Sequence, residues 1–330
     1  MSNIIVNPKT YTGTELEKIF FRPILTGQTA EELGIRVLYN MPVPTVLPVV
    51  NHSGNVLSPI DNNPSWVGSD KTTEKKEIAM ARVKAENSFS ASDYFSTIFE
   101  IISNQNNLNM EDLTGTELEQ AETELFRKAI AQSIRMNLWL GDKEGSLQTG
   151  YDSFDGVLKI VGEKVAANAF TMSAKDLNTK MNSSDVTALF DSMIAGASPK
   201  LKGLFNDGQV AFFVSPEVYN AYQEYLDTSF GTAAYSDVQT GRRQLMYHGF
   251  PVVEVNLEPA ISSSKLSKNF VIFTDRRNIV LAVNTADVPG SEIRMWYNPD
   301  EMENRQRAVF AIGCDILDDE IVCAAINQTA

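Results

Sequence analysis

The sequence predicts an α+β fold that is organised around one long helix, with extended segments packed beside it. Apolar residues recur at three- and four-residue spacing over residues 116–140, which is the period of a single helix face. Polarity alternates over residues 75–86, residues 209–214 form a nearly continuous apolar run, and residues 305–316 form a long extended run. Helical and extended patterns are interleaved along the chain, and there is no internal repeat.

The long helix carries clear start and stop signals. Thr114 and Glu117 have the spacing of a capping box, in which the threonine hydroxyl and the glutamate side chain satisfy free backbone donors. A helix over residues 116–140 would be about 37 Å long at 1.5 Å per residue. Gly141 and Asp142 end the pattern, and a second helix is expected after Asp155, which we expect to cap it.

Residues 36–86 predict a protruding hairpin. Two extended stretches flank a loop at 51–73 that is rich in Asn, Ser, Gly and Pro and contains Trp66. An exposed strand edge invites pairing, so a chain that keeps such a projection is expected to grip a neighbour with it. A disordered surface loop fits the same pattern and remains the alternative. Residues 1–35 are expected to form an arm that docks on another surface, with a short amphipathic helix near 14–21.

The middle of the chain predicts a mixture of helices and strands. Ser184 or Asp185 is expected to cap one helix, and Ser215 followed by Pro216 has the order of a helix start. A strand, a turn at 248–249 and a second strand are expected over residues 245–257. Two further strands are expected around the polar turn at 275–278, and the last segments are a charged turn at 298–304, the extended run and a final strand at 320–326.

Composition excludes several function classes. The formal net charge of −14 argues against a surface that binds nucleic acid by neutralising phosphates, and no basic patch compensates for it. No apolar run reaches the length of a membrane span, and the N-terminus lacks the pattern of a signal peptide, so folding in a cytoplasm is expected. The two cysteines, Cys314 and Cys323, lie among apolar residues and predict two buried, reduced thiols.

Residues that could form an active site are scarce. None of the phosphate-binding, nucleophile-elbow or zinc-protease motifs occurs, and the two histidines, His52 and His248, do not lie at recognisable catalytic turns. Two acidic clusters could in principle hold a metal or act as an acid/base pair, but solvated turn charge explains them better. They are Asp300, Glu301 and Glu303, and Asp318, Asp319 and Glu320. We therefore expect no enzyme, no metal and no cofactor.

Several stretches, in this order and spacing, resemble the major capsid proteins of tailed bacteriophages, which have the Hong Kong-type phage capsid fold. They are NLWLGD at 137–142, FDGVLK at 154–159, FVSPEVY at 213–219, YHGFPVV at 247–253, RNIV at 277–280 and the closing run at 305–325 with GCD at 313–315. The similarity covers roughly residues 75–327. Each motif is weak alone, and the order of all of them carries the resemblance.

The resemblance implies a division of the chain. Residues 1–35 would be the N-terminal arm and 36–86 the extended hairpin loop. Residues 87–165 and 288–317 would form a peripheral domain with the spine helix. Residues 166–287 and 318–330 would form an axial domain around capsomer symmetry axes.

The assembly interface expected from this resemblance has two parts. Trp66, Lys71, Lys75 and Lys76 lie in the hairpin. The other part is the peripheral turn, where subunits would meet around local three-fold axes. It comprises Asp300, Glu301, Glu303, Arg305 and Arg307. Some relatives link subunits through a Lys-Asn bond, but no motif here identifies such a pair.

Three functions follow as hypotheses. The first is an icosahedral shell of hexamers and pentamers that encloses double-stranded phage DNA. Its partners would be a separate scaffold protein, a portal and a possible decoration protein, and it would be a virion component assembled in the bacterial host cytoplasm. The second is an encapsulin-like nanocompartment shell that encloses cargo enzymes. The third is a soluble metal-dependent hydrolase that uses the acidic clusters.

Overall fold

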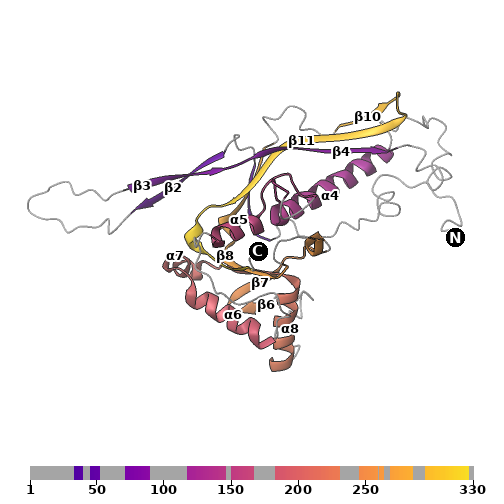
Figure 1. The fold of residues 1–330 in the computed structure, drawn as a ribbon. Helices are drawn as coiled ribbons and strands as arrows, with labels where there is room; N and C mark the ends of the chain where they lie inside the picture. Colours follow the sequence, from indigo (N-terminus) through magenta and orange to yellow (C-terminus); the bar gives the residue numbers. More distant parts are fainter. Residues whose placement is uncertain are drawn as a thin grey trace, which may run out of the picture.

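The computed structural model describes residues 33–39, 45–52, 71–89, 117–145, 150–166, 183–230, 245–258, 260–263, 268–284 and 294–326. Residues 1–32 of the predicted arm and residues 53–70 of the hairpin loop, with Trp66, lie outside these ranges. Within them, no helix has the length and apolar character needed to cross a membrane. The helices and strands form two five-stranded sheets, a long helix and a projecting pair of strands (Figure 1).

The first sheet contains the longest strand of the described chain, β11 (Glu303–Ile316). β4 (Ala81–Phe89) pairs with one edge of β11, and β10 (Arg294–Asn298) and β9 (Ile279–Asn284) pair with the other edge, all antiparallel. β1 (Arg36–Tyr39) adds to β9 in parallel. The extended character predicted for 305–316 is therefore confirmed, and it arises because neighbours on both edges pair with β11.

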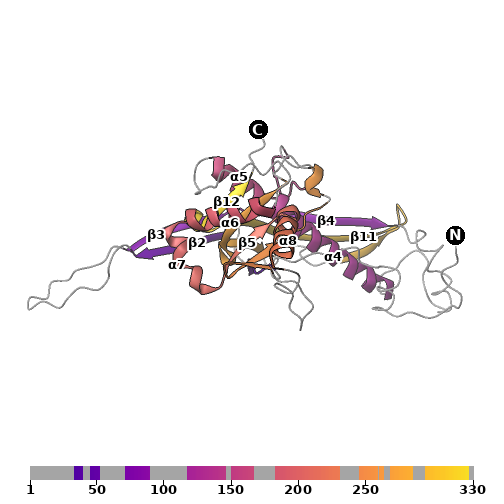
Figure 2. The ribbon, with the colours of Figure 1, turned by 90° about the horizontal axis from the view of Figure 1, so that it is seen from below.

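The second sheet has the order β12-β8-β5-β7-β6. Its strands are β12 (Val322–Ile326), β8 (Phe270–Asp275), β5 (Val210–Val214), β7 (Phe250–Glu254) and β6 (Leu245–Tyr247). β5 is buried along its whole length, as its continuous apolar run predicts. Helices α6 (Ser183–Gly196) and α8 (Pro216–Phe230) contribute to one apolar core with this sheet. The short α7 (Pro199–Gly203) lies at one end of this unit (Figures 1 and 2).

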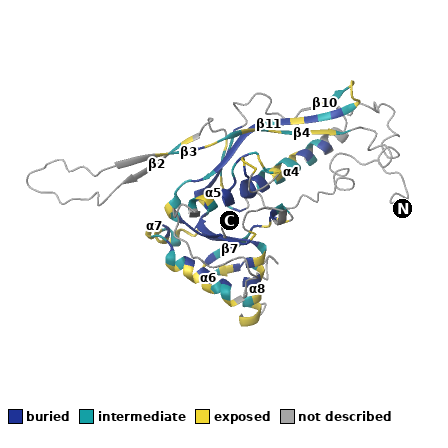
Figure 3. Cartoon of the chain, in the orientation of Figure 1, coloured by how far each residue is buried: buried dark blue, intermediate teal, exposed yellow. Residues whose placement is uncertain are grey.

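The long helix, α4, runs from Glu117 to Leu140, close to the predicted bounds. Its last turn is buried all round rather than along one stripe (Figure 3). Trp139 is fully buried there, with its ring centroid 5.8 Å from that of Phe213 and 6.1 Å from that of Phe270, which both belong to the second sheet. The end of α4 therefore fastens the two sheets into one apolar core.

Two of the chain's crossings from one sheet to the other are bonded to each other. One lies between β8 and β9 and the other between β11 and β12. The buried side chain of Asn278 donates a hydrogen bond to the Asp318 carbonyl (2.9 Å) and accepts one from the Asp318 backbone N–H (2.8 Å). Thr274 Oγ1 also donates to the Ile321 carbonyl at 2.8 Å. These bonds limit how far one sheet can rotate against the other.

Asp275, beside the first crossing, makes stability depend on pH. Burial would raise the pKa of its carboxyl, but hydrogen bonds and charge from Arg277 outweigh burial and lower the pKa below its ordinary value of 3.8. A lowered pKa stabilises the fold above the unfolded-state value, and this contribution is lost as the pH falls through the folded-state value. We therefore expect the free energy of unfolding of wild type to fall more steeply below about pH 4 than that of Asp275→Asn.

Asp207→Asn is the matched control for this prediction. Its carboxylate lies 3.4 Å from the same Arg277 guanidinium but is half exposed, whereas the Asp275 side chain is 4% exposed. The measurement is urea unfolding between pH 2.5 and 6. Equal acid dependence in Asp275→Asn and wild type would contradict the assignment.

Candidate functional site

The projecting hairpin is the first candidate surface. β2 (Thr45–His52) and β3 (Lys71–Ile78) pair antiparallel and extend away from both sheets (Figure 1). The hairpin expected for residues 36–86 is only partly built in this way. β1 and β4 join the first sheet instead, because β1 pairs with β9 and β4 pairs with β11 there. Residues 79 and 80 separate β4 from β3.

The base of the hairpin is anchored to the first sheet. Ile78 is fully buried in a small apolar cluster with Val280 and Ala282. The Lys76 ammonium lies 3.4 Å from Asp315 of β11. Lys76, expected at the interface, thus serves the attachment of its own hairpin. Lys75 is exposed, and Lys71 stands opposite His52 in the ladder.

The turn between β10 and β11 is the second candidate surface. Arg305 forms ion pairs with Glu301 and, at 3.8 Å, with Glu303, while Asp300 is exposed. Five residues predicted as interface residues lie on this turn and on the strand that follows it, including Arg307. Two large apolar side chains are exposed nearby, Trp296 at 41% and Met302 at 64%. Met302 also has φ of 53°, a left-handed conformation that is uncommon outside glycine.

Arg307 extends the charged surface onto β4. Its Nε lies 3.5 Å from Glu86, the residue directly opposite in the ladder, and Lys84 donates to the same carboxylate at 2.7 Å. The hydrogen bond from Lys84 lowers the pKa of Glu86, so this carboxylate stays charged. Two cations share one anion here, which leaves a local positive excess on an otherwise acidic chain.

The second acidic cluster is used internally. Lys164 of α5 (Val157–Ala166) pairs with Asp319, and Lys200 of α7 pairs with Glu320 and, at 3.7 Å, with Asp318. The hydrogen bond with Glu320 raises the pKa of Lys200. Among the described residues, no group of three or more His, Cys, Asp or Glu side chains could bind a metal ion. This cluster fastens two helices to the second crossing.

A corner between α4 and α5 was not identified as a site from the sequence. Asp142 and Lys159 are 0% and 5% exposed, and the Lys159 ammonium lies 2.8 Å from both Asp142 and Asp155. Burial would lower the pKa of Lys159, but the hydrogen bonds and charges of the two carboxylates outweigh burial and raise it. The spacing of Asp155 and Lys159, four residues apart at a helix start, is the signal that could have revealed the contact between these two side chains, whereas no local spacing indicates Asp142.

Two glycines make this corner possible. Gly156 N–H donates to the Gly141 carbonyl at 2.8 Å, so the chain before α5 lies directly against the end of α4. A Cβ on Gly141 would lie 2.2 Å from the Phe154 carbonyl oxygen, and one on Gly156 would lie 2.5 Å from Gly141 N. Asp155 was predicted to cap the second helix, but its carboxylate has other partners in the structure. It accepts hydrogen bonds from the Lys143 backbone N–H at 3.0 Å and from the Lys159 ammonium.

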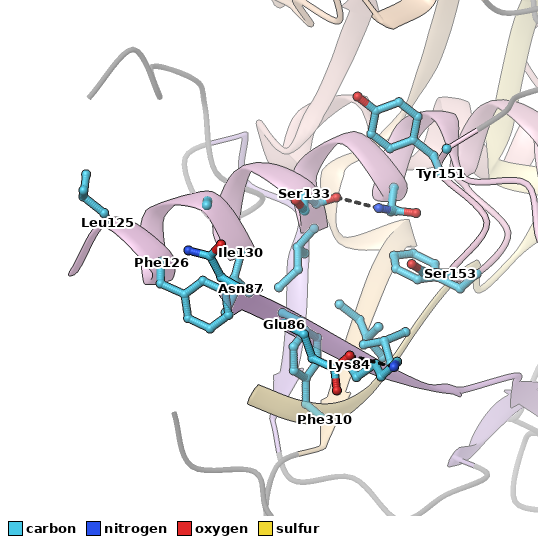
Figure 4. A pocket seen from close by; sticks show the side chains of 18 of the residues that line it. Lys84, Glu86, Asn87, Leu125, Phe126, Ile130, Ser133, Tyr151, Ser153 and Phe310 are labelled. Carbon is cyan, nitrogen blue, oxygen red and sulfur yellow. Dashed lines mark hydrogen bonds and ion pairs between the residues drawn. The ribbon is translucent and has the colours of Figure 1, made fainter. Parts of the chain in front are cut away.

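A groove of about 780 Å³ lies between α4 and the first sheet (Figure 4). Its walls are mainly apolar, with Phe126 and Ile130 from α4 facing Val83 and Phe310 from the sheet. The buried Asn137 contributes an Oδ1 without a hydrogen-bond partner, while its amide nitrogen donates to the Ser133 carbonyl at 2.8 Å. Among the described residues that line the groove, no nucleophile, base and oxyanion donors form a catalytic arrangement.

Both cysteines are buried thiols outside any disulfide, as predicted. Burial raises the pKa of the Cys323 thiol to about 11 and that of Cys314 further, so neither is a reactive thiolate at neutral pH. His248 lies in the exposed β6–β7 turn with its Nε2 3.4 Å from Asp191. It completes no catalytic arrangement with a serine in the described residues.

Comparison with known proteins identifies the fold. No protein-family model and no curated protein matches the sequence. Solved structures match over most of the chain. The capsid of a native GTA particle is 12% identical and covers 92% of this chain and 98% of its own, with a TM-score of 0.54. The capsid of Myoviridae phage XM1 is also 12% identical, with 92% of both chains covered and a TM-score of 0.52.

The procapsid of satellite phage P4, solved with its size determination protein, is 11% identical over 88% of this chain and 91% of that chain, with a TM-score of 0.52. At such low identity the likeness is one of fold. The chain therefore has the Hong Kong-type fold of tailed-phage major capsid proteins, as its sequence motifs indicate.

Proposed function

We propose that this protein is the subunit of an icosahedral shell that encloses double-stranded phage DNA. The observation that carries the proposal is the hairpin. Its paired strands β2 and β3 extend beyond both apolar cores, and among the described residues the hairpin is anchored to the first sheet near Ile78 and Lys76 (Figure 1). A lone two-stranded ribbon is marginally stable in water, so this one is expected to pack on a neighbouring copy.

Further support comes from how the charged groups are used. The acidic turn at 318–320 is paired with lysines of its own chain, which favours a structural role over a hydrolase. The exposed Trp296 and Met302 beside mixed charges suit an inter-subunit contact at the β10–β11 turn. The structures that share the fold include capsids of phages and of a GTA particle.

The copies would assemble as hexamers and pentamers, and many modest contacts would hold the shell together. A separate scaffold protein, a portal and a possible decoration protein would be the partners. Assembly would take place in the bacterial host cytoplasm and the product would be a virion component. The net charge of −14 suits a shell that confines DNA without binding its sequence.

Electron microscopy of the expressed full chain, with scaffold where it is required, tests the proposal. Closed shells of uniform size are expected. Shells from infected cells should contain nuclease-protected double-stranded DNA, whereas shells filled with a cargo enzyme would favour an encapsulin-like nanocompartment. A chain that stays monomeric under every assembly condition would overturn the proposal.

Arg305→Glu tests the β10–β11 turn. The reversal places a fourth acid beside Asp300, Glu301 and Glu303, so copies that meet there should repel one another. The stability of the isolated subunit should change by less than about 1 kcal/mol, because the pairs of Arg305 are partly exposed. Particle yield by sedimentation should fall at least tenfold. Lys143→Glu, an equally simple reversal at an exposed loop, is the control, and an equal loss in both variants would count against a specific role of the turn.

A further inference from the structure

Gly313 lies where the hairpin leaves the first sheet. On one edge of β11 it pairs with Ala282, and on the other edge the ladder with β4 ends one residue earlier, at Ile312 and Ala81. Residues 79 and 80, between β3 and β4, pass directly beside Gly313. A Cβ at this position would lie 2.1 Å from the Ala79 carbonyl oxygen and 3.1 Å from Met80 Cα. Both obstacles are backbone, so no side-chain rotation can relieve them.

The glycine is needed here for space, because its φ is not in the left-handed region. The close approach lets the chain turn from the β11 ladder into the hairpin without leaving the surface of the sheet. Two further contacts hold the chain just beyond this point. Ile78 is buried against Val280 and Ala282, and the Lys76 ammonium lies 3.4 Å from Asp315, two residues after Gly313.

We propose that Gly313 is the pivot that sets the direction of the hairpin, with the Lys76–Asp315 ion pair as its second restraint. Within the described chain, the strands beyond Lys76 pair only with each other. The direction of these strands is therefore set by the contacts at the base of the hairpin. The consequence for assembly rests on the proposed function: in a shell subunit, this direction determines where the hairpin meets the next copy.

The geometry gives the size of the effect. To admit a Cβ at Gly313, the Ala79 carbonyl must move by at least roughly 1 Å, which is the smallest shift that relieves the overlap with this oxygen. Neighbouring strands lie about 4.8 Å apart and a strand rises about 3.3 Å per residue. A displacement of this size at the base tilts the hairpin by roughly 12° and moves Lys75, four residues away, by about 2–3 Å.

Spin-label distances on the full chain test the pivot. Labels are attached to Lys75→Cys on β3 and Glu217→Cys on α8, both exposed positions. The native Cys314 and Cys323 are buried and will not take the label. Labelled chains are diluted with unlabelled chains, so that distances within one copy are measured whether or not the protein assembles. We expect Gly313→Ala to shift the mean distance by about 2–3 Å with an unchanged circular dichroism spectrum.

Gly162→Ala is the matched control, since a Cβ there meets no atom within 4 Å, and it should leave the distance unchanged. An unshifted distance in folded Gly313→Ala overturns the proposal. If that variant does not fold, Asp315→Asn decides, because it removes the ion pair without adding bulk and keeps an acceptor for the Ile316 N–H. It should broaden the distance distribution, and a wild-type distribution would overturn the proposal.

Particle images separate this inference from the proposed function. If wild type assembles, Gly313→Ala should give irregular particles or particles of another size. If wild type forms no shells, the proposed function fails, while the distances still decide whether Gly313 sets the hairpin direction.

Discussion

Shortening the hairpin should abolish shell assembly and leave the subunit folded. The variant replaces residues 50–73 with Asn-Gly, a dipeptide that favours a two-residue turn between the paired Val49 and Glu74. The anchored base is retained, including Ile78 and the Lys76–Asp315 ion pair. A contact worth about 3 kcal/mol per subunit would raise the concentration needed for assembly by more than about a hundredfold.

The measurement is particle yield by sedimentation over a range of protein concentrations. Thermal unfolding of the unassembled subunit is the control, and it should match that of wild type because the removed residues pair only with each other in the described chain. Shells that form at the wild-type concentration would show that the hairpin is not an assembly element.

Replacing Lys159 with Met should give the largest loss of subunit stability. The substitution keeps most of the side-chain volume but leaves the fully buried Asp142 without its cation. Removing one partner of a buried ion pair costs about 3–5 kcal/mol, because the remaining charge is neither solvated nor compensated. The loss should appear in urea unfolding of the unassembled subunit, and the junction of α4 and α5 should exchange its amide hydrogens faster.

Two variants make this prediction specific. Lys143→Met changes the same residue type at an exposed position just after α4 and should cost less than about 0.5 kcal/mol. The double variant Asp142→Asn and Lys159→Met should recover part of the loss, because no fully buried carboxylate is left without its cation. A single Lys159→Met variant as stable as wild type would mean that the buried pair contributes nothing.

Local patterns predicted most of the helices and strands. The periodic stretch at 116–140 became α4 at Glu117–Leu140, and the Ser215–Pro216 signal marked the start of α8. His248 and Gly249 form a turn in which both residues have positive φ, at 47° and 85°, between β6 and β7. These features depend on neighbours in sequence, which is why pattern and turn chemistry are sufficient to predict them.

The sequence pattern could not predict which strands pair with each other or which sheet each strand joins. The strands on either side of the turn at 275–278 look alike in sequence, yet β8 belongs to the second sheet and β9 to the first. Residues 75–86 alternate in polarity without a break, although β3 pairs with β2 and β4 with β11. The space that requires Gly313 to be glycine is created by Ala79, which is more than two hundred residues earlier in the chain.

At the candidate surfaces, too, the sequence indicated local features but not the tertiary contacts of individual side chains. The sequence indicated the charged β10–β11 turn, and the structure shows ion pairs and exposed apolar side chains there. Lys76 stays a predicted interface residue, and the structure adds an ion pair with Asp315 of its own chain that the sequence pattern did not indicate. The buried pair of Asp142 and Lys159 was missed, because two charged residues seventeen positions apart carry no local sign that they will be buried together.

Sedimentation velocity of the purified full-length chain, with scaffold where it is required, tests the self-assembly of this protein most directly. The expected result is a single fast-sedimenting species of shell size above a threshold concentration, which is lost in the variant with the shortened hairpin. A protein that sediments as a monomer at every concentration, with its hairpin protected from protease, would contradict the account.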